Sequence, residues 1–226
     1  MPRFQHPSGG NMKKLGYQRI YNRFLKRVID FFIALFLLIA ALPFIAVISI
    51  IIVIDSGFPI FYKPLRDGYK SKPFHIYKFR TMVKDADKGD GTTALNDPRI
   101  TRAGKYLRKL KLDEIPQLIN VLNSTMSFIG PRPELLKYTE RYEGDEKLIL
   151  QVRPGITDFS SIEFINLDEI VGEENPDEMY EKYVLKQKNE LRVKYAKEVS
   201  LKTDVSLFIK TCLQVLKKAI RVITKK

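Results

Sequence analysis

The stretch FFIALFLLIAALPFIAVISIIIVI, residues 31–54, decides the architecture of this chain. It holds 24 residues with no charge and a single hydroxyl group, that of Ser49. A continuous helix of this length would reach about 36 Å, which is enough to cross the ~30 Å hydrocarbon core of a bilayer. Pro43 lies near its middle, where it lacks a backbone donor and clashes with the carbonyl of Ile39. The stretch therefore predicts a membrane segment with Pro43 as its hinge.

Basic residues flank this stretch on both sides. Residues 1–54 carry seven basic groups against one acid, Asp30, and residues 63–80 carry six against Asp67. Because basic residues beside membrane segments prefer the cytoplasmic side, one interpretation is a re-entrant helix that breaks at Pro43 and returns to the side it came from. A spanning helix that tolerates its proline is the alternative. The residues alone leave both topologies open.

The formal net charge of +13 is unevenly spread along the 226 residues. Residues 206–226 carry six basic groups and no acid, on a predicted apolar-faced helix over 207–223 that contains the single cysteine, Cys212. This helix is expected either in the interface plane of a bilayer or packed on the domain, with Cys212 in its packing. Since the charge clusters beside apolar segments, we expect anionic lipid as a partner. Nucleic acid is not expected, because no recognition motif supports it.

Four segments follow from these patterns. We expect a disordered leader over 1–14, a basic amphipathic helix and the membrane helix over 15–56, a cytosolic domain over 57–200 and a basic interfacial helix over 201–226. Inside the domain, short strands are predicted at 60–62 and 74–79 and an extended piece at 126–129. Helices are predicted at 99–110, from 113 onward, at 134–151 and at 180–196. The fold class is therefore α/β, mostly helical with small sheet elements.

An adjacent carboxylate pair, Asp113 and Glu114, precedes a predicted helix and is surrounded in the sequence by cations. A divalent cation bound together with substrate phosphates would offset the repulsion within the pair. Arginines suit phosphate through bidentate hydrogen bonds, and a helix start favours anions. This suggests phosphoryl transfer at a membrane surface, whereas capping and solvation are the plainer alternative. The candidate phosphate- or substrate-binding cations are Lys78, Arg80, Arg99, Arg108, Arg132 and Arg153.

Six motifs occur in a fixed order over residues 20–200. They are KRVID at 26–30, YKFRTM at 77–82, NDPRITRAG at 96–104, LRKLKLDEIPQLINVL at 107–122, MSFIGPRPE at 126–134 and RPGIT at 153–157. In this order they resemble the bacterial sugar transferases known as small monotopic phosphoglycosyl transferases.

The resemblance implies a monotopic membrane protein with a re-entrant helix and a catalytic domain on the cytoplasmic face of the bacterial inner membrane. Its reaction would move a sugar-1-phosphate from a UDP-sugar to polyprenol (undecaprenyl) phosphate, releasing UMP, with Mg²⁺ as cofactor. Asp113 would be the nucleophile, forming an aspartyl-phosphosugar intermediate, and would also hold the metal. Glu114 would assist the second step or the metal. Lys78, Arg108 and Arg132 occupy basic positions of the family motifs and would hold phosphates.

The sequence leaves several points open. A homodimer and downstream glycosyltransferases are further candidate partners. Lys111 stands where serine or threonine is common in the family, and Thr157-Asp158-Phe159 replaces the frequent Thr-Gly-Trp, so the sugar carried is not indicated. The competing class is a non-catalytic membrane-surface module that binds anionic lipid and a partner glycosyltransferase.

Overall fold

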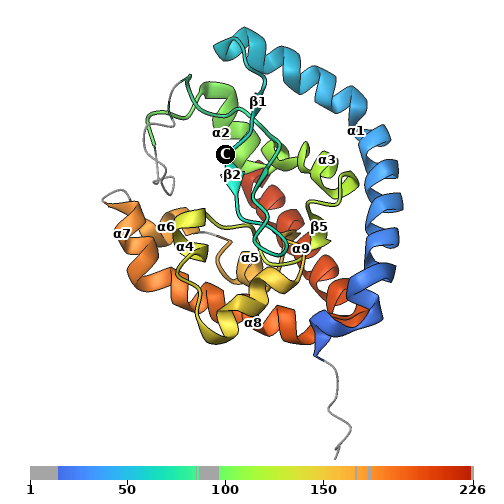
Figure 1. The fold of residues 1–226 in the computed structure, drawn as a ribbon. Helices are drawn as coiled ribbons and strands as arrows, with labels where there is room; N and C mark the ends of the chain where they lie inside the picture. The colour runs from blue at the N-terminus through green and yellow to red at the C-terminus, as the bar shows by residue number, and fades with distance from the viewer. Residues whose placement is uncertain (1–14, 85, 87–96, 166, 173–174, 225–226) are drawn as a thin grey trace, which may run out of the picture.

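The computed structural model describes residues 15–84, 86, 97–165, 167–172 and 175–224, so the expected leader over 1–14 lies outside the described residues. A 3₁₀ turn η1 (Gly16–Gln18) and a π-helical turn η2 (Tyr21–Leu25) lead into α1 (Lys26–Ser56). Pro43 lies inside α1, and Gly57 ends the helix with a φ of 75°. Figure 1 shows α1 running along one side of the domain and then turning, so that its second half arches over the top. α1 thus continues through Pro43, where the sequence analysis expected a break, and the change of direction in Figure 1 occurs within one helix.

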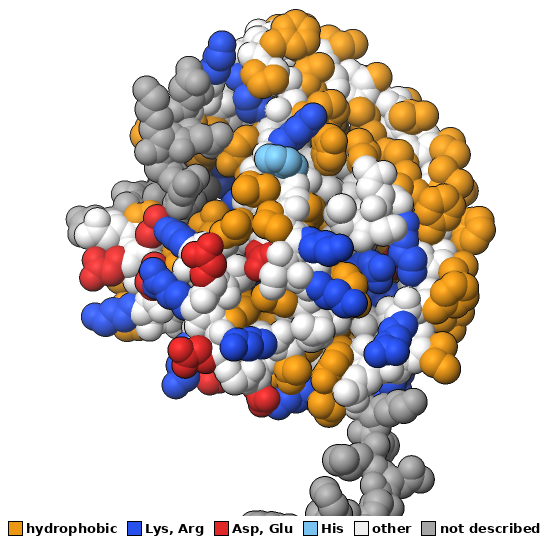
Figure 2. Space-filling view, in the orientation of Figure 1, with side chains coloured by type: hydrophobic (Ala, Val, Ile, Leu, Met, Phe, Trp, Pro, Cys, Tyr) orange, Lys and Arg blue, Asp and Glu red, His pale blue; other side chains and the backbone are white. Residues whose placement is uncertain are grey.

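One narrow side of α1 packs against the domain over both halves of the helix. Ala34 in the first half is fully buried with Phe74 and Val121, while Ile52 in the second half packs with Phe79. The opposite side is exposed, with Phe36 at 71%. Figure 2 shows this apolar surface as the rim of hydrophobic side chains along α1. Six of the buried or half-buried residues follow one another in steps of four and three, as one helical stripe requires: Ala34, Leu38, Ala41, Ile45, Ile48 and Ile52.

The described sheets are small, as the sequence predicted. β1 (Phe61–Tyr62) pairs antiparallel with β4 (Lys78–Phe79), and β2 (Leu65–Arg66) pairs antiparallel with β3 (Phe74–His75). β5 (Ser127–Ile129) pairs in parallel with β6 (Gly155–Thr157). β1 pairs with β4 across β2 and β3, and β5 pairs with β6 across α4 (Leu136–Thr139) and η5 (Gly144–Gln151), so these two pairs join segments that are separated in the sequence.

The helices of the domain are short. α2 (Arg102–Lys109), the 3₁₀ turn η4 (Leu112–Glu114) and α3 (Gln117–Leu122) follow the first strands. The single helix expected over 134–151 is wrong, because α4 (Leu136–Thr139) and the 3₁₀ helix η5 (Gly144–Gln151) are separate. Gly144, with a φ of 50°, marks the break.

A second group of helices closes the domain. It contains α5 (Phe159–Glu163), α6 (Leu167–Val171) and α7 (Pro176–Met179). The helix predicted at 180–196 is confirmed as a π-helical turn η6 (Tyr180–Leu185) that continues into α8 (Lys186–Glu198). In Figure 1, α8 lies at the foot of the domain, on the side away from the second half of α1.

The last helix, α9 (Leu201–Thr224), packs on the domain, which is one of the two alternatives left open by the sequence; its place at a bilayer interface stays a prediction. Its inner side packs on β5, β6 and α5, where Leu207 is buried and Thr211 hydrogen-bonds Thr157. Its outer side exposes apolar residues, with Phe208 at 51%. The expectation that Cys212 serves packing is wrong, because this residue lies on the exposed side.

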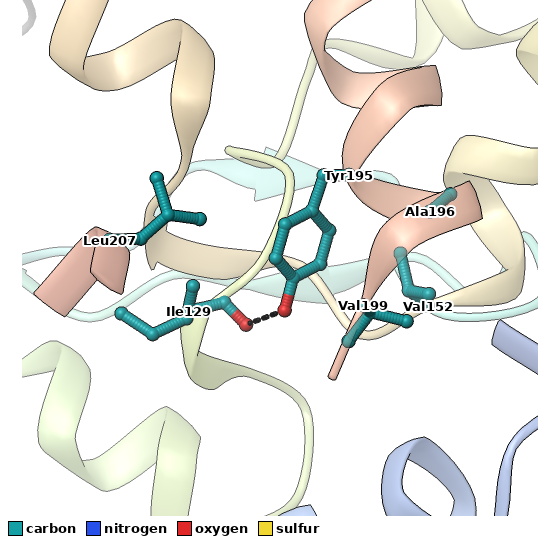
Figure 3. Packing of buried hydrophobic residues seen from close by; sticks show 6 residues of the cluster. All are labelled: Ile129, Val152, Tyr195, Ala196, Val199 and Leu207. Atoms are coloured by element: carbon teal, nitrogen blue, oxygen red, sulfur yellow. Dashed lines mark hydrogen bonds between the residues drawn. The ribbon is translucent and has the colours of Figure 1, made fainter. Parts of the chain in front are cut away.

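A buried polar network joins α1, α8, α9 and β5. The Asp204 carboxylate lies 2.5 Å from Lys26 Nζ and 2.7 Å from the hydroxyl oxygens of both Tyr21 and Tyr195. The Tyr195 hydroxyl also lies 2.9 Å from the Ile129 carbonyl oxygen, within the cluster drawn in Figure 3. Because the chain leaves β5 at Ile129, this network fixes the point from which the segment carrying Arg132 starts.

Candidate active site

The carboxylate pair lies in η4, a 3₁₀ turn that precedes α3. Lys111, at the N-terminal side of this turn, adopts the left-handed conformation with a φ of 59°. α3 itself begins only at Gln117, after Pro116. The expectation that the helix starts near Asp113 is therefore displaced by about one turn, and the pair is held by the tight turn between α2 and α3.

Glu114 is held by two cations. Its Oε2 lies 3.2 Å from Arg132 Nη1, its Oε1 lies 2.5 Å from Arg132 Nη2, and Lys78 Nζ lies 3.6 Å from Oε1. Burial raises the pKa of Glu114, but Arg132 and Lys78 outweigh it and hold this pKa well below its usual range. Glu114 is thus a permanent anion that orients two cations.

Asp113 differs sharply from its neighbour. It is 8% exposed, and its buried Oδ1 has no hydrogen-bond partner among the described residues. Burial raises the pKa of Asp113 above its usual value, Lys78 opposes this shift, and the Glu114 charge reinforces it. A buried carboxylate oxygen without a donor costs free energy, which a ligand in the site would recover.

Lys78 is positioned by a buried amide of α3. The Asn120 side chain accepts a hydrogen bond from Tyr77 N at 2.8 Å and donates one to the His75 carbonyl at 2.8 Å. These bonds fix the turn from which β4 brings Lys78 beside the carboxylates. Burial lowers the pKa of Lys78 to about 8, although Glu114 raises it.

Arg132 is positioned by the parallel pair β5 and β6. Its Nη1 donates to the Ile156 carbonyl at 3.1 Å, and the chain just before it is fixed by a 2.9 Å bond from Gly130 N to the Thr157 carbonyl. A Cβ atom on Gly155 would lie 2.1 Å from Gly130 N, so the two strands can meet this closely only with glycine at position 155. The motifs GPRP and RPGIT therefore form one structural unit.

The remaining predicted cations lie in different surroundings. Arg108 is half-buried, and its charge acts to lower the pKa of Asp97 and opposes the rise in the pKa of Asp113. The Arg99 guanidinium lies 2.6 Å from the Asp97 carboxylate. Lys78, Arg108 and Arg132 thus gather around the pair.

Arg80 and Arg153 bond to backbone instead. Arg80 is buried, and its Nη2 donates to the carbonyls of Ser56, at 2.9 Å, and Gly57, at 2.5 Å, so it caps the end of α1. Arg153 donates to the Ser124 carbonyl at 3.1 Å. The contacts described for these two residues are structural, and Arg80 Nε and Nη1 have no hydrogen-bond partner among the described residues.

Sequence reasoning missed Gln117, the first residue of α3. It is 1% exposed, and its Nε2 has no hydrogen-bond partner among the described residues. Its place in the motif that also holds Asp113 and Glu114 was the available signal, although a 3₁₀ turn and Pro116 separate the pair from α3. A glutamine in an apolar pattern gave no reason by itself to expect a role in the site.

No cluster of three or more histidine, cysteine or acidic residues that could hold a metal occurs in the described part of the chain. Mg²⁺ in phosphate chemistry is held by one or two carboxylates together with substrate phosphates and water. The unpaired Oδ1 of Asp113 fits this kind of site, whereas both oxygens of Glu114 already accept bonds from Arg132.

Comparison with known proteins places the chain in a family. The sequence pattern of the bacterial sugar transferases matches residues 21–218. A Bacillus subtilis protein, named provisionally as an undecaprenyl-phosphate N-acetylgalactosaminyl 1-phosphate transferase, is 46% identical over 122 residues, which cover 54% of this chain and 68% of that protein.

Two longer relatives match a similar region. The UDP-glucose:undecaprenyl-phosphate glucose-1-phosphate transferase of Escherichia coli is 39% identical over 146 residues, covering 62% of this chain and 31% of the relative. The undecaprenyl-phosphate galactose phosphotransferase of Salmonella typhimurium is 38% identical over 152 residues, covering 60% and 32%. The chain thus spans about a third of these enzymes. With the six ordered motifs and the matching pattern over residues 21–218, this chain belongs to the bacterial sugar transferase family.

Proposed function

We propose that this protein transfers a sugar-1-phosphate from a UDP-sugar to undecaprenyl phosphate and releases UMP. The names of the relatives support this reaction class. The observation that carries the proposal is the buried, unpaired Oδ1 of Asp113 beside Lys78 and the Glu114–Arg132 pair. A carboxylate with a free oxygen, surrounded by cations, suits nucleophilic attack on a phosphoryl group.

In the proposed first step, an Asp113 oxygen attacks the phosphorus that bears the sugar. The new bond joins Asp113 to phosphorus, and the bond from phosphorus to the UMP oxygen breaks. In the second step, an oxygen of undecaprenyl phosphate attacks the same phosphorus and releases the Asp113 carboxylate. Lys78 and Arg132 stabilise the charge on the transferring group, while Glu114 keeps both cations in place.

Mg²⁺ fits the same geometry, with Asp113 as the protein ligand. The ion would neutralise charge on the diphosphate of the donor. Both oxygens of Glu114 are engaged by Arg132, so we assign Glu114 to the orientation of cations rather than to the metal.

We propose a monotopic placement on the cytoplasmic face of the inner membrane. By length and composition, the helical run Tyr21–Ser56 could cross a membrane. A spanning helix, however, would carry one half away from the domain, whereas both halves of α1 pack on it through Ala34 and Ile52. A re-entrant helix satisfies these contacts and leaves the outer face in lipid. The exposed side of α9, with Phe208, Ile209 and Leu213, is a second candidate surface for the interface.

Cysteine labelling tests the placement. In a Cys212→Ser background, single cysteines at the exposed positions Gln18 and Ser71 should react only from the cytoplasmic face. Labelling of one of them from the opposite face would rule out the re-entrant helix.

Intact-protein mass spectrometry tests the chemistry. After mixing with a UDP-sugar and Mg²⁺ without a lipid acceptor, the protein should gain the mass of a sugar phosphate, mapped to Asp113. Asp113→Asn should lower UMP release by at least about 100-fold, because an amide cannot form the intermediate. Wild-type turnover by Asp113→Asn would sink the proposal.

A further inference from the structure

Gln117 stands out among the buried amides of α3. Its side chain is 1% exposed, and Nε2 has no hydrogen-bond partner among the described residues. Asn120, three residues later and 2% exposed, bonds to Tyr77, His75 and Thr125. A buried donor without an acceptor costs about 1–3 kcal/mol. Asn120 therefore shows what a structural amide looks like in this helix, and Gln117 differs from it.

The unpaired groups at the start of α3 have opposite polarity. Gln117 Nε2 is a donor and Asp113 Oδ1 is an acceptor, and both are buried. They lie one turn apart in the chain, yet no bond joins them. A ligand that meets both must offer an acceptor to the amide and an electrophilic or cationic centre to the carboxylate. A phosphoryl group does so, with its nonbridging oxygens and its phosphorus.

We propose that Gln117 is a substrate-contacting residue whose Nε2 donates a hydrogen bond to a nonbridging oxygen of the phosphoryl group that Asp113 attacks. This inference rests on the proposed function and deepens it. Lys78 and Arg132 approach the carboxylate pair as charged donors on the Glu114 side. Gln117 adds a neutral donor on the α3 side, which stabilises the transferring group without adding charge beside Asp113.

Two substitutions separate the donor from the shape of the side chain. Gln117→Met keeps the length and removes the donor, and Gln117→Glu keeps the shape but adds a negative charge. The assay uses UDP-glucose, UDP-galactose or UDP-N-acetylgalactosamine, whichever the wild type turns over, and follows adduct formation without lipid. We expect Gln117→Met to slow this step by about 10- to 100-fold and Gln117→Glu to slow it further. Gln117→Met should keep or raise the thermal midpoint, because it removes a buried donor without a partner, whereas Asn120→Ala, the structural control, should lower it.

A sulfur-substituted donor distinguishes direct contact from a structural role. One nonbridging oxygen of the phosphate that bears the sugar is replaced by sulfur, a weaker acceptor, and the two diastereomers are compared. The wild type should discriminate between them, and Gln117→Met should lose part of this discrimination, because the two changes would remove the same bond.

The outcomes separate the two proposals. If the wild type forms no adduct, the proposed function fails. If the wild type forms the adduct and Gln117→Met forms it at the same rate, or with the same diastereomer ratio, the inference alone is overturned. A slower Gln117→Met reaction with an altered ratio supports it.

Discussion

Glu134 with Arg192 and Glu114 with Arg132 are partly buried carboxylate–arginine pairs of the described domain, and only the second has an unpaired acceptor beside it. Glu134 Oε2 lies 2.5 Å from the Tyr180 hydroxyl oxygen and 2.9 Å from Arg192 Nη2, while Oε1 accepts the Leu135 amide at 3.2 Å. The Glu114–Arg132 pair is similarly bonded, but the adjacent Asp113 keeps Oδ1 free. The same residue types thus build a structural centre in one place and a candidate reaction site in the other. Arg192 Nε also has no hydrogen-bond partner among the described residues, so the difference is the unpaired acceptor, Asp113 Oδ1, beside the second pair.

The pKa directions follow this contrast. Burial raises the pKa of Glu134, but Arg192 and Tyr180 outweigh it and the pKa is lowered. Burial also raises the pKa of Asp113, and there the neighbouring cations do not overcome it. A scaffold carboxylate is stabilised as an anion by the fold, whereas the Asp113 carboxylate depends on a ligand for part of its stabilisation.

The largest stability effect is expected at the structural centre. Glu134→Gln leaves the buried Arg192 charge without its partner and should lower the free energy of unfolding by about 3–5 kcal/mol. Denaturant unfolding measures this change. Asp145→Asn is the matched control. The Asp145 carboxylate lies 2.6 Å from Lys197 Nζ, but both side chains are exposed, so this pair should contribute no more than about 1 kcal/mol. Equal losses from both substitutions would contradict the assignment of Glu134 to the scaffold.

In the candidate active site, we expect a loss of activity rather than a loss of stability. Glu114→Gln removes the charge that orients Arg132 and Lys78, so kcat/KM should fall by about 100-fold, corresponding to about 2.7 kcal/mol. UMP release measures the rate, and circular dichroism checks the fold. Comparable activity in Glu114→Gln and the wild type would mean that the cations are held without this carboxylate.

The pH dependence should show a limb from Lys78. Burial lowers its pKa to about 8, so its ammonium charge is present below this pH and is lost as pH rises through it. Above the pKa, kcat/KM for the UDP-sugar should fall by up to about tenfold per pH unit. Lys78→Arg keeps the charge at high pH and should remove the limb. A limb that survives in Lys78→Arg would belong to another group.

The smallest effect is expected at Lys111, just before the turn that carries Asp113 and Glu114. Lys111 holds a φ of 59°, which costs a non-glycine residue about 1–2 kcal/mol. Lys111→Gly should therefore stabilise the fold by roughly 1 kcal/mol, as measured by urea unfolding. Lys105→Gly, at an exposed position in the middle of α2, should instead destabilise the fold by a similar amount. A loss of stability in Lys111→Gly would show that the side chain makes contacts outweighing the backbone strain.

Periodicity and composition predicted the elements whose character is local. The apolar run became α1, and the apolar-faced C-terminal pattern became α9. The error over 134–151 also has a local cause, because Gly144 was available as a break signal and was not used. What periodicity could not predict is that α1 packs on the domain along both of its halves.

The chemistry of individual side chains was harder to predict. In the sequence, every arginine near the carboxylate pair is a candidate phosphate ligand. In the structure, Arg80 Nη2 donates hydrogen bonds to the carbonyls at the end of α1. Gln117 and Glu134 were not predicted, since a buried polar side chain is defined by partners distant in the chain. The motifs predicted a role for Asp113 and Glu114. Only the structure shows that both oxygens of Glu114 accept hydrogen bonds, whereas Asp113 Oδ1 accepts none among the described residues.

The stripe on α1 has a consequence for how this protein can be handled and how it can evolve. Ala34, Ile48 and Ile52 belong to the same hydrophobic clusters as domain residues, and Arg27 donates to the last carbonyls of α3. Cutting the chain after Ser56 would expose the clusters and leave those carbonyls uncapped, so the truncated protein should aggregate rather than become a water-soluble enzyme. A foreign membrane anchor could not replace α1 either, unless it reproduced the same stripe. α1 and the domain that carries the candidate site are therefore expected to be inherited as one unit.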